Sequence, residues 1–147
     1  MNDPTIHASV VLTGAKAVLI RGASGTGKSR LAWSLLQAAK QGVLPFARLV
    51  ADDRAHIEAH HGRLLARPAA ELAGFIEVHG LGIRQIPFEP LATIGLVVDL
   101  AVDDAGRHPG PLAATIAGIT LPRLAVAPGM RAFPLVLAAL CTAPAPD

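Results

Sequence analysis

Tyrosine is absent from this 147-residue chain, and aromatic residues make up only 3% of it. Hydrophobic residues nevertheless account for 52%, so the core must be built from alanine, leucine, valine and isoleucine. Disordered chains carry too little apolar surface to fold, and this composition is instead typical of a globular protein. At this length we expect one domain over residues 1–147, with residues 141–147 as a frayed tail.

The chain also has little cysteine, no long apolar run and no concentration of positive charge. A single cysteine, Cys141, excludes an intramolecular disulfide and favours a reducing cytoplasm. Asp99 and Pro134 interrupt the longest apolar runs, which stop short of the roughly 20 residues of a membrane span, so no membrane partner is expected. The opening MNDPTIH does not resemble a secretory signal. Thirteen Lys and Arg are scattered among eleven acids, so no nucleic-acid partner is expected.

Short β-rich runs outnumber helical patterns by about two to one, which predicts an α/β fold with a mixed sheet, hairpins and few helices. The expected elements, in chain order, are a hairpin over 8–13 and 17–21, a helix over 29–42, a strand over 46–53, a hairpin over 56–68 turning at Gly62, a short helix opened by Pro68, an extended segment over 75–86 broken by Gly80 and Gly82, a buried central strand over 92–102, a loop over 103–111, one or two strands over 114–128 and a closing helix over 130–141.

A glycine-rich segment, GASGTGKS, follows the second predicted strand and precedes the first predicted helix. It satisfies the phosphate-loop pattern GxxxxGK[ST], in which backbone N–H groups and a helix N-terminus cradle phosphates. Lys28 is expected to reach the outer phosphates, and Ser29 to give an oxygen to Mg²⁺. A chance glycine-rich turn would explain neither residue. The residues predicted to bind a nucleotide are Gly22, Ala23, Ser24, Gly25, Thr26, Gly27, Lys28 and Ser29.

Two adjacent acids, Asp52 and Asp53, end the predicted strand that follows the helix. If this strand delivers the chain to the nucleotide, one carboxylate can bind the metal or its waters. The other can accept a proton from an acceptor hydroxyl. The residues alone leave another interpretation open, in which Asp53 merely caps the following turn.

Four segments together resemble the catalytic domain of HPr kinase/phosphorylase: VLIRGASGTGKSRLAWSLLQ, RLVADDR, FIEVHGLGIRQI and LPRLAVAPGMRAFPLVLAAL. The similarity runs from about His7 to Leu140 and looks like the short form of the family, without the N-terminal domain. The resemblance implies a phosphate-loop fold related to that of phosphoenolpyruvate carboxykinase. It also implies ATP and Mg²⁺ as cofactors, assembly as a hexamer, and phosphorylation of a serine of HPr, the phosphocarrier of the bacterial sugar phosphotransferase system.

The resemblance also implies roles for individual residues. His7 stands where the family has a catalytic histidine, and Glu77 matches the second magnesium ligand beside Ser29. One of Asp52 and Asp53 matches the residue that is the base in phosphorylation and the acid in the reverse phosphorolysis. The sequence does not distinguish which of the two it is. Arg107 is the nearest candidate for the family's catalytic arginine. The family uses this last part of the chain for dephosphorylation, and here the segment VAPGMRA departs from the family pattern because Met130 is inserted before Arg131. The resemblance therefore supports kinase activity more strongly than phosphorolysis.

Other interpretations remain open from the residues alone. His7 can be a surface histidine, and Glu77 can lie on the solvent side of an alternating strand. Three histidines with Glu58 can suggest zinc, but without cysteine partners or a third well-placed ligand no zinc site is predicted for His56, His60 and His61. The competing functions are a small-molecule kinase similar to phosphoenolpyruvate carboxykinase and a non-catalytic nucleotide sensor that binds a regulator.

Overall fold

The computed structural model describes residues 4–103 and 112–146. Its elements, in chain order, are β1 (Thr5–Leu12), β2 (Ala17–Arg21), α1 (Lys28–Lys40), β3 (Arg48–Ala51), β4 (Arg54–His60), β5 (Arg63–Pro68), the 3₁₀ helix η1 (Ala70–Leu72), β6 (Phe75–Val78), β7 (Gly82–Gln85), β8 (Ala92–Asp99), β9 (Ala113–Ile116), β10 (Ile119–Ala125) and α2 (Ala132–Cys141). Among the described helices, none has the length and apolarity to cross a membrane.

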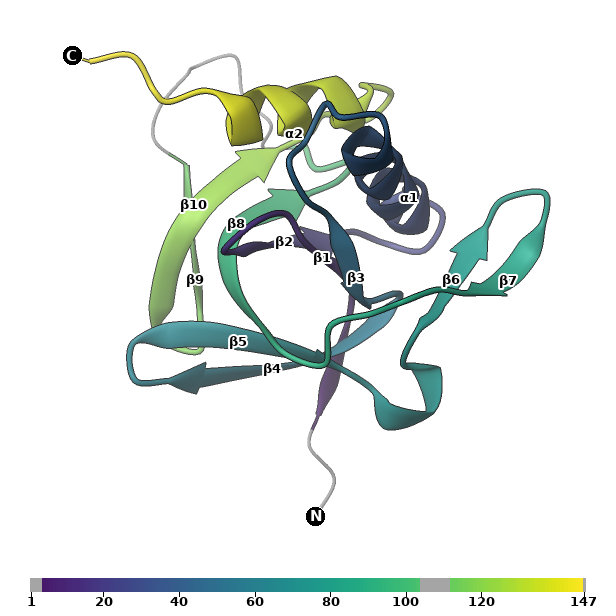
Figure 1. The fold of residues 1–147 in the computed structure, drawn as a ribbon. Helices are drawn as coiled ribbons and strands as arrows, with labels where there is room; N and C mark the ends of the chain where they lie inside the picture. Colours follow the sequence, from purple (N-terminus) through teal and green to yellow (C-terminus); the bar gives the residue numbers. More distant parts are fainter. Residues whose placement is uncertain (1–3, 104–111, 147) are drawn as a thin grey trace.

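A mixed sheet forms the centre of the molecule. Its main layer runs in the order β3-β1-β2-β8-β10-β9, with β2 and β10 parallel to β8 and the other neighbours antiparallel. The β4–β5 hairpin pairs with the first residues of β1 and of β8 and forms a second layer beneath it (Figure 1). Helices α1 and α2 cover the opposite face of the main layer (Figure 1). The predicted α/β fold with a mixed sheet and few helices is confirmed.

The sheet is buried on both faces, and strand β2 shows why its sequence is continuously apolar. Alternate side chains of a strand point to opposite faces. Val18 and Ile20 pack against the helices, in one core cluster with Leu35 of α1. Ala17 and Leu19 pack in a second cluster that includes side chains of the β4–β5 layer. Burying a leucine or isoleucine of this kind contributes about 1.5–3 kcal/mol, so both layers hold the strand in place.

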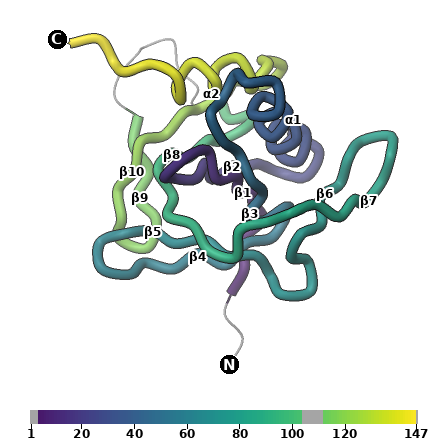
Figure 2. The backbone as a smooth tube through the Cα atoms, in the orientation of Figure 1, coloured from purple at the N-terminus to yellow at the C-terminus, as the bar shows by residue number. Residues whose placement is uncertain are grey.

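The predicted hairpins and buried central strand are confirmed, but two local expectations change. Pro68 ends β5 instead of opening a helix, and the short helix is the 3₁₀ turn η1 that begins at Ala70. The segment over 75–86 is a β6–β7 hairpin, because Gly80 and Gly82 adopt left-handed φ angles of 83° and 103° that reverse the chain. Figure 2 shows this hairpin standing out from the body of the molecule.

Parallel strands bring several polar segments to one edge of the sheet. The glycine-rich loop follows β2, Asp52 follows β3, and Asp99 is the last residue of β8. Both β2 and β3 are antiparallel to β1, and β8 is parallel to β2, so the carboxyl ends of all three strands lie at the same edge. In open α/β sheets this edge is the usual place for a ligand.

Candidate functional site

The glycine-rich loop connects β2 directly to α1. Gly25 and Gly27 have φ angles of 85° and 100°, which favour glycine, and a Cβ on Gly22 would lie 2.5 Å from Thr26 Oγ1. Thr26 holds the loop closed by donating its N–H (3.2 Å) and its Oγ1 hydroxyl (2.7 Å) to the carbonyl of Ala23. The loop is therefore a tight backbone curve at the positive end of a helix, an arrangement that suits anions.

Lys28 is the first residue of α1, and its side chain is directed into this curve. The residue is only 7% exposed, and its Nζ donates to the carbonyls of Gly22 (2.8 Å) and Ala23 (3.3 Å). Phosphate oxygens are stronger acceptors for an ammonium than neutral carbonyls are, because the hydrogen bond is then charged on both sides. The lysine thus lies where it can exchange loop carbonyls for a phosphate.

Asp52 is buried directly beside the loop, at 8% exposure. Its Oδ1 accepts hydrogen bonds from Ser9 Oγ and Ser29 Oγ, both at 2.7 Å, and its Oδ2 accepts one from the Glu77 N–H at 3.0 Å. All three donors are neutral, so they orient the carboxylate without cancelling its charge. A buried anionic oxygen beside a loop hydroxyl suits Mg²⁺, which in phosphoryl-transfer sites binds one or two carboxylates together with substrate phosphates.

Ser9 belongs to this arrangement, and the sequence analysis did not single it out. It is fully buried in β1, where it donates to Asp52 and accepts the Asp53 N–H at 3.3 Å. The available signal was a lone hydroxyl within the apolar run ASVV, since a buried hydroxyl needs a partner.

Asp53 lies in a very different environment from its neighbour. The Arg54 N–H donates to the Asp52 carbonyl at 2.8 Å, which closes a three-residue turn with Asp53 at its centre and a φ of 68°. This positive φ interrupts the regular alternation of the strand, and the Asp53 side chain is 62% exposed. Its Oδ1 lies 3.9 Å from Nδ1 of His7, which is also exposed. The two acids therefore present one buried and one accessible carboxylate.

One open cleft of about 410 Å³ brings together part of the loop with Asp53 and Glu77, while Asp52 and His7 are not among its lining residues. Its lining residues are Ser24, Gly25, Gly27, Lys28, Ser29, Arg30, Asp53, Glu77 and His79. Glu77 and His79 come from the β6–β7 hairpin and its turn, so the hairpin forms the wall that faces the loop. Asp52 is not among the lining residues and contacts the cleft through Ser29.

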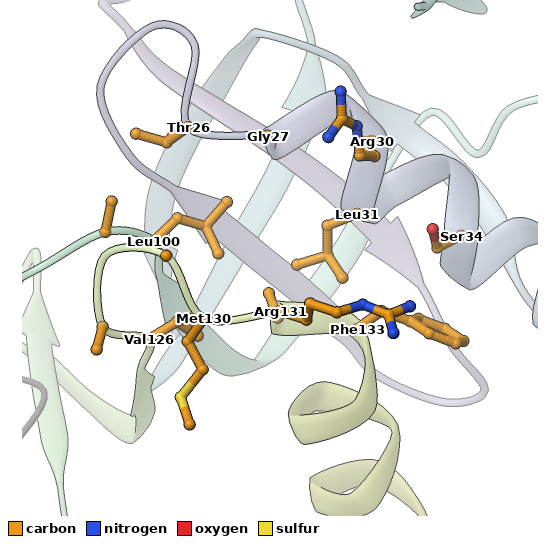
Figure 3. Close-up of a pocket in the computed structure, with 14 residues that line it drawn as sticks. Thr26, Gly27, Arg30, Leu31, Ser34, Leu100, Val126, Met130, Arg131 and Phe133 are labelled. Carbon is orange, nitrogen blue, oxygen red and sulfur yellow. The ribbon is translucent and has the colours of Figure 1, made fainter.

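The structure places only one of the two arginines discussed from the sequence. Arg107 falls outside the described residues. Arg131 precedes α2 and, together with Met130, lines a second hollow that adjoins the cleft (Figure 3).

A second buried carboxylate, Asp99, lies at the end of β8. Arg21 donates from Nε to Oδ1 at 2.7 Å and from Nη2 to Oδ2 at 2.8 Å, while Arg123 Nε donates to Oδ2. Burial raises the pKa of Asp99, but the hydrogen bonds and charges of Arg21 and Arg123 outweigh it and hold the pKa below its usual 3.8. No motif in the sequence indicated this cluster, because its members are widely separated along the chain.

Within residues 4–103 and 112–146, no three His, Cys, Asp or Glu side chains are grouped so that they could hold a metal ion. The rings of His60 and His61 contact each other, with centroids 4.1 Å apart, at the turn of the β4–β5 hairpin. A magnesium ion at the loop would therefore depend on Ser29, on neighbouring carboxylate oxygens and on the nucleotide itself.

Comparison of the sequence with known proteins gives one family. Residues 2–89 match the model of the HPr Serine kinase C-terminal domain. The HPr kinase/phosphorylase of Clostridium tetani is 31% identical over 105 residues, which cover 67% of this chain. That of Streptococcus thermophilus is 40% identical over 83 residues, or 56% of the chain.

A solved structure, that of the HPr(Ser) kinase/phosphatase from Coxiella burnetii, matches with a TM-score of 0.74 and 24% identity. The match covers 94% of this chain and 88% of the solved one and shows a shared fold. The aligned part spans only 32% of the length of the Clostridium tetani relative and 25% of that of the Streptococcus thermophilus relative. Because the family model matches more than half of this chain's residues, the chain belongs to the HPr serine kinase C-terminal domain family.

Proposed function

We propose that this chain is an ATP-dependent protein-serine kinase that phosphorylates HPr. The observation that carries the proposal is the single cleft in which Lys28 and Ser29 of the loop face the accessible carboxylate of Asp53. Phosphoryl transfer needs phosphates held in position and a base near the acceptor hydroxyl, and this cleft combines both. Family membership favours this function over the small-molecule kinase and the nucleotide sensor.

The glycine-rich loop supports ATP as the phosphoryl donor, in a fold of the phosphate-loop type. Its left-handed glycines, the buried Lys28 and the start of α1 form a tight curve, in which a Cβ at Gly22 would clash with Thr26 Oγ1. We propose that the loop, residues 22–29, binds the phosphates and that Lys28 neutralises their negative charge during transfer.

The donor atoms beside the loop fit Mg²⁺. Ser29 Oγ lies 2.7 Å from Asp52 Oδ1, and Glu77 lines the same cleft. We propose that Ser29 and Glu77 bind the ion or its waters, with Asp52 holding the serine in place. When bound, Mg²⁺ would neutralise charge on the phosphates.

The unequal exposure of the two acids supports a division of labour between them. Asp52 is buried and accepts hydrogen bonds from three donors, whereas the Asp53 carboxylate is exposed and lines the cleft. We therefore assign proton transfer to Asp53, which takes the serine proton as the serine oxygen bonds to the outer phosphorus and the bond to ADP breaks. His7 lies beside Asp53 and can orient it. In the reverse phosphorolysis, Asp53 would return the proton.

Several parts of the proposal concern the whole enzyme. HPr is the proposed partner, in the cytoplasm, where the single cysteine Cys141 would stay reduced. Arg107 is proposed as a catalytic arginine, and a homo-oligomer such as a hexamer as the assembly.

The test is direct phosphorylation of HPr. The protein, ATP, Mg²⁺ and HPr from the same organism should yield phosphoserine on HPr, detected by mass spectrometry. HPr with its acceptor serine changed to alanine is the control and should remain unmodified. ATP consumption with a metabolite while HPr stays inert, or tight ATP binding without any transfer, would contradict the proposal.

A further inference from the structure

A second hollow, of about 370 Å³, adjoins the cleft beside the glycine-rich loop (Figure 3). Helix α1 contributes Arg30, Leu31 and Ser34 to one wall. The opposite wall comes from the ends of β8 and β10 and from the segment that leads into α2. The volume falls within the range of small-molecule sites, about 300–1,000 Å³.

This hollow is continuous in its lining with the cleft that contains the acids. Gly27 and Arg30 line both, so the two meet at the first turn of α1. Lys28 and Ser29, which in a phosphate loop serve the outer phosphates and their metal, line only the cleft. A triphosphate with its outer end in the cleft would therefore leave the loop across Gly27 and Arg30, toward the hollow.

The chemistry of the hollow differs from that of the cleft. Buried Leu31, Leu100 and Val126 give the two walls apolar surface, and the partly buried Phe133 lies beside Arg131 (Figure 3). It contains no carboxylate among its lining residues. Apolar surface with a planar guanidinium suits the face of an aromatic ring, because arginine stacks on such faces.

We propose that this hollow is the nucleoside subsite of the enzyme, with Arg131 and Phe133 contacting the base and Ser34 facing the sugar side. The proposal rests on the proposed binding of ATP at the loop. It gives a role to Met130, the residue that separates Gly129 from Arg131 and departs from the family pattern. Met130 and Gly129 form the wall next to the base, and the left-handed φ of 79° at Gly129 turns the chain there.

The experiment compares ATP with inorganic tripolyphosphate, which carries the phosphates without a nucleoside. Titration calorimetry with Mg²⁺ would measure both ligands on the wild-type chain and on Ser34→Phe, which fills the hollow from α1. ATP should bind at least 10-fold more weakly to this variant, while tripolyphosphate changes less than 2-fold. Lys40→Phe places the same side chain at an exposed position near the other end of α1 and should change neither affinity.

Arg131→Ala is a second variant, at an exposed position whose side chain makes no capping hydrogen bond to α2. ATP should bind about 3- to 10-fold more weakly to it, as expected for the loss of one cation–π contact of about 1 kcal/mol, again without an effect on tripolyphosphate. Unchanged ATP affinity in both variants would overturn the subsite, as would equal losses for ATP and tripolyphosphate. Wild-type protein that binds neither ligand would instead refute the proposed function.

Discussion

Two buried carboxylates occupy equivalent places in the sheet and have opposite surroundings. Asp52 follows β3 and Asp99 ends β8, and they are 8% and 7% exposed. Asp99 is bound by Arg21 and Arg123, which cancel its charge. Asp52 is bound by two hydroxyls and one N–H, which satisfy its hydrogen bonds but leave its charge.

This difference shows how the same residue type can be neutralised by cationic donors at one strand end and keep its charge at another. A buried charge is costly unless it is paired, so Asp99 with its arginines is complete without a ligand. The acid turn, Asp52–Asp53, keeps negative charge beside Ser29 and the loop, where a bound cation would balance it. Position along the sheet edge is therefore a weaker guide to function than the charge of the neighbouring donors.

The largest effect is expected when the accessible acid of the turn is neutralised. Asp53→Asn should reduce the rate of phosphoryl transfer to HPr by about 10²–10⁴, since a general base contributes that much. Asparagine tolerates a positive φ, so thermal stability and ATP affinity should stay near wild type. Transfer assays with calorimetry would separate these quantities. Retention of full transfer by this variant would exclude Asp53 as the base.

Neutralising the arginine-bound acid should act on folding. Asp99→Asn should lower the free energy of unfolding by about 2–3 kcal/mol, because Arg21 and Arg123 lose their charged partner. The loss is smaller than for a fully buried ion pair because Arg21 is partly exposed to solvent. Urea unfolding would measure the change. The matched control is Asp103→Asn, at an exposed turn, which should stay within about 0.5 kcal/mol of wild type. A loss no larger than the control's would show that the arginines carry no net stabilisation.

Neutralising the buried acid of the turn should have a mixed and smaller effect. Asp52→Asn should weaken Mg²⁺-dependent ATP binding about 10-fold and reduce stability by about 1–2 kcal/mol, because the amide replaces one acceptor oxygen with a donor. Calorimetry with and without Mg²⁺ is the measurement. If the loss of affinity were equal in both conditions, Asp52 would act on the fold of the loop alone.

The smallest effect is expected from pH. Because the pKa of Asp99 is lower in the folded state than its usual 3.8, folding is favoured wherever the carboxylate is ionised. This contribution should be complete above about pH 3.8 and disappear as pH falls through the lowered value. Urea midpoints between pH 6 and pH 2.5 should therefore fall less steeply in Asp99→Asn than in the wild type. If the urea midpoints of the two proteins fell equally with pH, the lowered pKa of Asp99 would be contradicted.

The sequence was informative wherever the signal is local. The turns at 14–16 and 62, the amphipathic spacing of α1 and the apolar run of β8 each depend on neighbours a few residues apart, and the structure has these elements. Pro68 and the 75–86 segment were less well predicted. A proline fits the end of a strand as well as the start of a helix, and strand pairing across Gly80 depends on contacts that the pattern does not encode.

The sequence by itself determined the loop, its lysine and serine, and the presence of two acids at the end of a strand, since these are contiguous motifs. Only the tertiary structure distinguished the acids, because the positive φ at Asp53 and the hydrogen bond from Ser9 depend on how β1 packs against β3. The same holds for the arginines around Asp99 and for the hollow beside α1. These features join segments that are distant in sequence, and long-range packing alone decides which side chains meet.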